Sequence, residues 1–277
     1  MLRRICLSTT TATALALTPI ANAAVPVVEQ GARVVVVDKG MCTIGFNDPD
    51  QRISYTAGHC GEHGSRAAVG QASGTFYPST AFGRSATGND WGIIRWDDGV
   101  QLGANTITTD AVVDLEDLHP NDEVCLLNAG EKRCGTFVDR LGNNVYFDSE
   151  LGVKGDSGAP VWAPGRGLVA VYSGVSTVSN GKGESSSLNR ASKPVNGPGV
   201  SEAQEIELIS ATKPISAPVV HGTGIPEAPA TDVAPTGSST SPEAIAAIVV
   251  AVAVVVGLLM PFFGPVLEQF AVSVGLR

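Results

Sequence analysis

Short apolar runs bounded by turn residues recur along the chain between residue 31 and about residue 176. The runs are separated by Asp, Asn, Gly and Pro, which is typical of strands joined by tight turns. We expect strands at residues 33–37, 42–46, 91–96, 123–127, 135–138, 144–147, 160–162 and 167–172. This spacing predicts an all-β fold, either a sandwich or a pair of barrels.

The composition changes after Val175, first to Ser, Gly, Asn, Lys and Pro, and then, from residue 210 to 243, to Pro, Ala, Thr and Ser. Residues 210–243 hold too little apolar side chain to offset the entropy lost when a chain is ordered, so we predict a flexible stalk. Residues 205–209 are a candidate last strand. The globular domain is therefore predicted to span residues 24–209.

The first 23 residues have the pattern of an export signal. Two arginines, Arg3 and Arg4, precede an apolar run, which ends in the small residues Ala-Asn-Ala. This order is typical of a signal peptide, and we predict cleavage after Ala23. An uncleaved anchor is the alternative. We expect the remainder of the protein to be exported.

Residues 244–267 contain no charged side chain and are about as long as the roughly 20 residues that cross a bilayer. A buried core helix is the alternative, but such a helix would alternate with polar positions. We predict a transmembrane helix, with residues 268–277 as a short tail on the cytoplasmic side. The predicted globular domain would then lie outside the cell, held to the membrane by a single span.

Composition narrows the possible partners. The formal net charge is −9, and Arg3, Arg4 and Arg277 lie in the two ends, so the part between them is more acidic than the whole chain. An acidic surface is a poor match for a phosphate backbone, and we expect no nucleic-acid partner. Gly is abundant at 32 residues and aromatic residues make up only 5%, which favours a turn-rich β protein over a helical bundle.

Four cysteines remain once Cys6 is removed with the signal peptide. They are Cys42, Cys60, Cys125 and Cys134. An even number in an oxidising compartment predicts two disulfides, and four cysteines allow three pairings. The nearest-neighbour pairing closes two short loops, but sequence alone does not select it.

Three segments carry candidate chemistry. His59 stands in Thr-Ala-Gly-His-Cys, Asp90 in Asn-Asp-Trp-Gly-Ile-Ile-Arg, and Ser157 in Gly-Asp-Ser-Gly-Ala-Pro. In this order the segments resemble those of trypsin-like serine peptidases, and most of all the short streptogrisin-like bacterial branch, with residues 41–47 and 133–136 as further matches. The resemblance implies two antiparallel six-stranded β-barrels, the first carrying His59 and Asp90 and the second Ser157.

The roles follow from what acyl transfer needs. A serine hydroxyl is a weak nucleophile until a base takes its proton, which makes His59 the base for Ser157. Asp90 would orient the imidazole and stabilise its charged form. The resemblance assigns the oxyanion hole to the backbone N–H groups of Gly155 and Ser157, and Gly158 allows a tight turn behind the nucleophile. These roles imply a serine endopeptidase that needs no cofactor or metal, acts as a monomer and binds a peptide or protein substrate.

The resemblance also assigns residues that bind substrate or stabilise the site. Leu151 would form the floor of the specificity pocket, Val175 would narrow its wall, and Ser173 would lie beside Asp90 at the start of the strand that pairs with substrate. We therefore predict cleavage after small or medium apolar side chains. Asp156 needs an internal cation, for which Arg133 and Arg140 are the candidates, and activity should not require N-terminal processing.

Two alternatives and one departure from the family pattern remain. His59, Glu62 and His63 fit an inverted zinc-peptidase pattern, although Gly61 weakens the helix that it requires. The second alternative is a trypsin-like fold that is kept as a surface binding module with negligible turnover. The departure is Ala159, which adds a methyl group where a second Gly is usual. We expect this methyl group to be tolerated.

Overall fold

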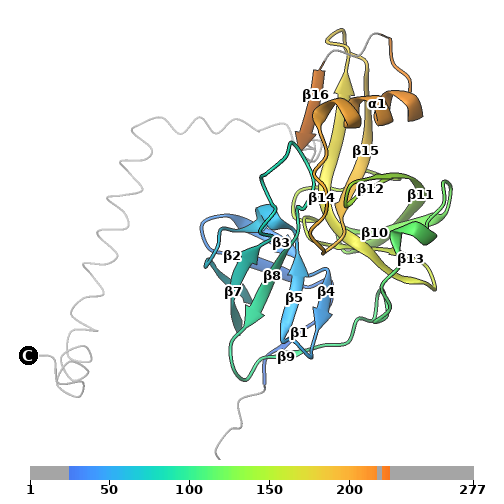
Figure 1. The fold of residues 1–277 in the computed structure, drawn as a ribbon. Coiled ribbons are helices and arrows are strands. Elements are labelled where there is room, and N and C mark those ends of the chain that lie inside the picture. The colour runs from blue at the N-terminus through green and yellow to red at the C-terminus, as the bar shows by residue number, and fades with distance from the viewer. Residues whose placement is uncertain (1–24, 217–219, 225–277) are drawn as a thin grey trace, which may run out of the picture. The chain divides into compact units, whose positions relative to one another are not determined.

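The computed structural model describes residues 25–216 and 220–224, and strands make up most of its regular structure (Figure 1). The strands form two seven-stranded sheets, and the candidate site residues lie in or next to their strands. A short parallel pair joins β1 (Val27–Val28) to β9 (Gln101–Leu102). The helical elements are the 3-10 helices η1 (Gly58–Cys60) and η2 (Leu115–Asp117), and the α-helix α1 (Glu202–Thr212).

The two edge strands of the first sheet, β3 and β4, are consecutive in the chain, and the sheet curls between them. Its order is β3-β2-β6-β7-β8-β5-β4, and its bounds are β2 (Arg33–Val36), β3 (Gly40–Thr43), β4 (Phe46–Asp48), β5 (Ile53–Thr56), β6 (Arg66–Val69), β7 (Ala72–Pro78) and β8 (Gly92–Trp96). Ile44 and Gly45 are the two residues that connect β3 to β4. Ile44 N donates to Ala32 O at 2.9 Å, and Gly45 N donates to Tyr55 O at 2.8 Å. The curled face encloses an apolar core that includes Val34, Phe76 and Ile94.

The second sheet closes into a barrel. Its order is β13-β10-β11-β12-β15-β14-β16, with a further pairing of β13 to β14, and its bounds are β10 (Glu123–Asn128), β11 (Glu131–Leu141), β12 (Asn144–Asp148), β13 (Pro160–Ala163), β14 (Gly167–Ser179), β15 (Ser185–Ser192) and β16 (Val220–Gly224). The pairing of β13 to β14 closes a ring of six strands, and β16 lies outside that ring. The prediction of two six-stranded barrels is therefore confirmed for this sheet, whereas the ladders of the first sheet form a curled, open sheet.

The chain beyond residue 176 differs from the sequence-based prediction. β14 continues to Ser179 and β15 completes the barrel, while residues 205–209 lie in α1, so the predicted last strand there is wrong. Ser201 and Gln204 form a capping box at the start of α1, and Glu205 and Ile209, one helical turn apart, are both buried. β16 lies within the residues predicted to form the stalk.

Both disulfides follow the nearest-neighbour pairing. Cys42 is bonded to Cys60, which ties β3 to η1, and Cys125 is bonded to Cys134 across the β10–β11 ladder. The predicted signal peptide, the membrane segment and the tail all lie outside the described residues. Within residues 25–216 and 220–224, no helix is long and apolar enough to cross a membrane.

Candidate active site

The three side chains selected from the sequence form one hydrogen-bonded row at the junction of the two sheets. His59 Nε2 lies 2.8 Å from Ser157 Oγ, and His59 Nδ1 lies 2.8 Å from Asp90 Oδ2. The backbone N–H of His59 donates to Asp90 Oδ1 at 2.9 Å, which fixes the carboxylate a second time. With Nδ1–H donated to Asp90, Nε2 is the nitrogen that accepts the proton of the serine hydroxyl.

The local backbone places His59 beside the segment that carries the carboxylate. His59 is the middle residue of η1, and the next residue, Cys60, is held to β3 by its disulfide to Cys42. Gly58 packs so closely that a Cβ atom there would lie 2.9 Å from the carbonyl oxygen of Trp91. A glycine before the histidine therefore allows the two segments to approach each other.

Asp90 is oriented by a left-handed residue and by serines of the second sheet. Asn89 has φ +55°, a conformation that Asn tolerates better than most residues, and its side chain exchanges hydrogen bonds with the backbone of Gly197. Asp90 N donates to Ser192 Oγ at 3.2 Å. Ser173 Oγ donates to the backbone carbonyl oxygen of Asp90 at 3.4 Å. Ser173 lies within β14 and not at the start of a strand.

The charges and hydrogen bonds that His59 and Asp90 exchange shift the pKa values of both residues. Burial works to lower the pKa of His59, but the charge of Asp90 and its hydrogen bond outweigh both burial and the nearby charge of Arg190, and raise that pKa. Burial works to raise the pKa of Asp90, but the charge and hydrogen bonds of His59, together with Arg190, lower it. The carboxylate is therefore ionised at neutral pH although it is only 6% exposed.

Ser157 lies in a tight turn just before β13. Ala159 N donates to Asp156 O at 2.7 Å across this turn, and Gly158 adopts φ +84°. A Cβ atom at Gly158 would lie 2.0 Å from Thr56 Oγ1, so only glycine fits at this position. The methyl group of Ala159 is fully buried in the apolar core of the barrel, and the fold thus accommodates the departure noted in the sequence.

The backbone N–H groups of Gly155 and Ser157 remain available to a ligand. In the described part of the chain, neither N–H has a hydrogen-bond acceptor. The carbonyl oxygen of Gly155 is held from the first sheet, where Thr43 Oγ1 donates to it at 2.8 Å and Arg33 Nη1 also donates to it. The two N–H groups that the sequence predicts as oxyanion donors therefore have no competing acceptor among the described residues.

The carboxylate of Asp156 is buried and has an arginine partner from the first sheet. Asp156 Oδ1 accepts from Ala129 N at 2.9 Å and lies 3.4 Å from Nη2 of Arg33 on β2, while Oδ2 accepts from Val153 N at 2.9 Å. The same guanidinium donates to the carbonyl oxygen of Gly155 through Nη1. Arg33 therefore joins β2 to the loop that carries Ser157.

The prediction that Arg133 or Arg140 partners Asp156 is wrong. Arg133 pairs with Glu131 at 2.5 Å and with Glu150 at 3.2 Å, and Arg140 pairs with Glu116. Both arginines lie on β11, where they meet acidic side chains at the surface. The sequence held no signal for Arg33, because Arg33 is the first residue of an apolar strand and has an exposed position there, like an ordinary surface arginine.

The predicted specificity residues Leu151 and Val175 lie near Asn189, a buried residue that the sequence did not single out. Leu151 O accepts from Asn128 at 2.9 Å, and Val175, which is 2% exposed, lies opposite Asn189 on β15. The side-chain oxygen of Asn189 accepts from Gly152 N and from the hydroxyl of Tyr172, both at 3.0 Å. Asn189 therefore ties the Leu151 segment to β14.

The zinc alternative lacks the required geometry. Glu62 pairs with Lys39 at 2.7 Å, and the ring of His63 lies against that of Tyr77 with 4.9 Å between centroids. Among the described residues, no group of side chains close enough to share a metal ion combines His59 with Glu62 or His63. The helix η1 is also only three residues long, too short to bring both imidazoles to one ion.

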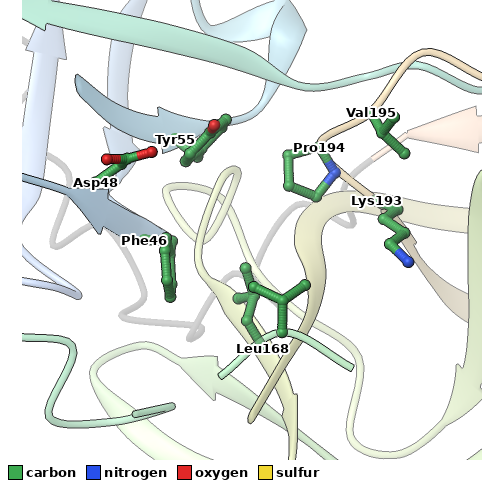
Figure 2. A pocket seen from close by; sticks show the side chains of 8 residues that line it. Phe46, Asp48, Tyr55, Leu168, Lys193, Pro194 and Val195 are labelled. Atoms are coloured by element: carbon green, nitrogen blue, oxygen red, sulfur yellow. The ribbon is translucent and has the colours of Figure 1, made fainter. Parts of the chain in front are cut away.

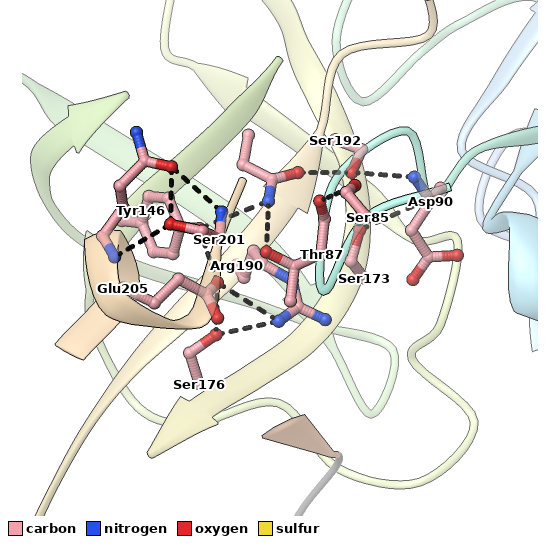
Figure 3. A network of polar contacts seen from close by, with 12 residues as sticks. Ser85, Thr87, Asp90, Tyr146, Ser173, Ser176, Arg190, Ser192, Ser201 and Glu205 are labelled. Carbon is pink, nitrogen blue, oxygen red and sulfur yellow. Dashed lines mark hydrogen bonds and ion pairs between the residues drawn. The ribbon is translucent and has the colours of Figure 1, made fainter. Parts of the chain in front are cut away.

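A second polar cluster connects α1 to the backbone of Asp90 (Figure 3). Glu205 of α1 accepts from Tyr146 at 2.5 Å and lies 3.4 Å from Arg190 Nη1. The hydrogen bonds continue from Tyr146 through Asn144 and Ser192 to the backbone N–H of Asp90. Burial and the charge of Glu205 raise the pKa of Tyr146, so its hydroxyl stays protonated and can donate.

A cavity of about 220 Å³ opens elsewhere, between the two sheets (Figure 2). Phe46 and Tyr55 line it from the first sheet, Leu168 lines it from the second, and Lys193 lines it from just after β15. None of His59, Asp90 and Ser157 lines this cavity, so it is not part of the row described above.

The structure is that of a mostly β protein with a closed six-stranded barrel, a curled sheet, and serine, histidine and aspartate side chains joined where the two meet. Two similar solved structures are a Cellulomonas bogoriensis chymotrypsin (22% identity, TM-score 0.44, covering 60% of this chain and 91% of that chain) and a Nocardiopsis protease (20%, 0.45, 60% and 92%). Both TM-scores are low, so these two likenesses add no functional evidence.

Two curated relatives come from Mycobacterium tuberculosis, the uncharacterized protein MT1863 of strain CDC 1551 and the uncharacterized protein Rv1815 of strain H37Rv. Each is 31% identical over an alignment of 159 residues, and the match covers 50% of this chain and 70% of the relative. The chain belongs to the family of these mycobacterial proteins. No family model matches the sequence.

Proposed function

We propose that this protein is a serine endopeptidase that hydrolyses peptide bonds through an acyl-enzyme, with Ser157 as nucleophile, His59 as base and Asp90 as the group that orients the base. The hydrogen-bonded row from Ser157 Oγ through both ring nitrogens of His59 to Asp90 is the observation that carries the proposal. Each atom of the row has the role that acyl transfer requires of it.

The chemical steps balance within these residues and the substrate. Ser157 Oγ forms a bond to the scissile carbonyl carbon while its proton moves to His59 Nε2, and the carbonyl oxygen becomes an oxyanion that accepts from the N–H groups of Gly155 and Ser157. His59 then gives that proton to the leaving amine as the C–N bond breaks. A water molecule, deprotonated by His59, hydrolyses the acyl-enzyme and restores the serine hydroxyl.

The proposed substrates are cut after small or medium apolar side chains. Leu151 and Val175 carry no charge to attract Lys or Arg, and Val175 is almost fully buried against β15. A library of peptides that differ only at the residue before the cut checks this preference. Main cleavage after Lys or Arg would contradict it.

We also propose that the enzyme acts outside the cell, tethered to the membrane by residues 244–267 after removal of residues 1–23. The support is the charge and hydropathy pattern of the sequence. Fractionation of cells that express the full chain, before and after protease treatment of intact cells, tests the placement. Protection of the β domain from external protease would contradict it.

Labelling with a fluorophosphonate tests the chemistry directly. The full chain, purified in detergent, is expected to be labelled, and Ser157→Ala is expected to lose the label. Ser185→Ala, a change at the exposed first residue of β15, is the matched control and should be labelled like the native chain. No labelling of the native chain would leave only the alternative of a surface binding module.

A further inference from the structure

Strand β16 occupies one edge of β14, close to the row of site residues. The ladder is antiparallel and pairs Val220 with Ser179 at one end and Gly224 with Val175 at the other. β14 has β15 on its opposite edge throughout this stretch, so β16 adds as an outer strand beyond the closed barrel (Figure 1). A segment from the C-terminal part of the chain thus occupies hydrogen-bonding positions on a strand that carries site residues.

The same edge of β14 leads to the nucleophile. β13 pairs with β14 as far as Val171, and the backbone of Tyr172 exchanges hydrogen bonds with Gly158 N (2.7 Å) and Ala159 O (2.9 Å), immediately after Ser157. Within the described residues, neither the β13 nor the β16 ladder includes Ser173 or Gly174. This gap of two residues follows Tyr172, which bonds to the residues just after Ser157, and it separates the β13 ladder from the β16 ladder.

The direction of β16 matters. Because the ladder is antiparallel, the chain from Val220 to Gly224 runs toward the gap and therefore toward Ser157. An extended peptide that entered the site along this edge in the same direction would bring its next carbonyl groups to the nucleophile. Adding a strand to an exposed edge is a general way for a fold to bind an extended peptide, and main-chain hydrogen bonds supply the affinity.

We propose that β16 is a built-in competitor of the substrate, an autoinhibitory strand that occupies the edge of β14 from Val175 to Ser179 and must leave before an extended peptide can pair there. The inference rests on the proposed function and adds its regulation. A peptide that needs the backbone groups of Val175 to Ser179 cannot pair while residues 220–224 hold them. A small reagent that reacts only at Ser157 does not need this edge.

The test compares substrates that do and do not need the edge. Gly222→Pro with Thr223→Pro removes two adjacent N–H groups and should release β16, because neighbouring residues of a strand point their N–H groups to opposite sides. Gly222→Ala with Thr223→Ala is the matched control, since it keeps both N–H groups. Gly222→Pro alone is a milder second variant.

In the double-proline chain we expect kcat/KM for a casein-derived decapeptide to rise about tenfold, equivalent to about 1.4 kcal/mol of lost competition. The rate of fluorophosphonate labelling should stay within about twofold, because a surface change of this kind leaves Ser157 untouched. Amide hydrogen exchange at Val175 to Ser179 should become faster in the proline variants only. The double-alanine chain should behave like the native chain in all three measurements.

Each other outcome has a definite meaning. Normal labelling with unchanged decapeptide hydrolysis in both proline variants would overturn the inference and leave the proposed function standing. Unchanged exchange at Val175 to Ser179 would show that β16 does not occupy the edge in solution, and would overturn the inference as well. No labelling of any chain would remove the proposed function, and the inference with it.

Discussion

Replacing Arg33 by glutamine should weaken catalysis although Arg33 lies on a different sheet from Ser157. Its guanidinium lies 3.4 Å from Asp156 and donates to the carbonyl oxygen of Gly155, so the change leaves a buried carboxylate without its arginine partner and loosens the loop of the oxyanion donors. Removing one partner of a fully buried pair costs about 3–5 kcal/mol. The side chain of Arg33 is 38% exposed, and Asp156 keeps two backbone donors, so we expect about 2 kcal/mol.

If that cost falls on the transition state, kcat for a peptide substrate should drop about 30-fold, with KM nearly unchanged. Arg33→Lys keeps the charge but not the forked geometry, and should recover part of the loss. Arg140→Gln, which removes an exposed ion pair, is the matched control and should change kcat by less than about twofold. Full activity of Arg33→Gln, with normal thermal stability, would refute the reasoning.

Three further predictions concern the row and its supports. Activity should be lost as the pH falls and the His59 imidazole is protonated, and the raised pKa of His59 should set this acid limb of kcat/KM above pH 6.5. Asp90→Asn should move the limb to lower pH and cut kcat by about 10⁴-fold. Rates measured between pH 5 and 9 check both. Gly158→Ala should lower the free energy of unfolding by about 3 kcal/mol in urea titrations, since φ +84° and the lack of space both exclude a side chain; an unchanged midpoint would refute this. Glu205→Gln leaves the charge of Arg190 buried, so we expect a loss of about 3 kcal/mol in the same assay, and a loss below 1 kcal/mol would show that the pair is unimportant.

Local sequence predicted the parts of the site that depend on local backbone. The turn at Gly158 needs glycine for its own φ angle. The apolar run at residues 33–37 predicted the strand that the structure has at Arg33–Val36. The motifs around His59, Asp90 and Ser157 predicted a row that the structure does bring together. Each of these features is encoded within a few residues of where it acts.

The partner of Asp156 could not be predicted in this way. Arg33 lies 123 positions earlier in the sequence, and its outward position on β2 has the pattern of an ordinary surface charge. Only the packing of the two sheets shows that this outward face meets the loop before Ser157. Arg133 and Arg140 looked suitable by resemblance, but β11 directs them to acidic neighbours instead.

The C-terminal elements were missed for two different physical reasons. Residues 205–209 alternate like a strand, but the capping box begun by Ser201 starts a helix, and burial of Glu205 beside Arg190 fixes its orientation. β16, with the sequence Val-His-Gly-Thr-Gly, holds little apolar side chain, which is why the sequence favoured a stalk. A strand that joins the edge of a finished barrel needs only backbone donors and acceptors, so a weakly apolar segment can pair there.

Helix α1 and strand β16 both bear on how the site is supported and controlled. The two elements follow one another in the chain. Helix α1 reaches the backbone N–H of Asp90 through Glu205, Tyr146 and the hydrogen bonds beyond them. Strand β16 occupies the edge of β14. The first connection holds the backbone of Asp90 in position, whereas β16, in the proposal above, competes with extended substrates for the edge of β14. A change that releases β16 but leaves Glu205 in place should therefore raise the turnover of extended substrates, and a change that displaces both should lower it.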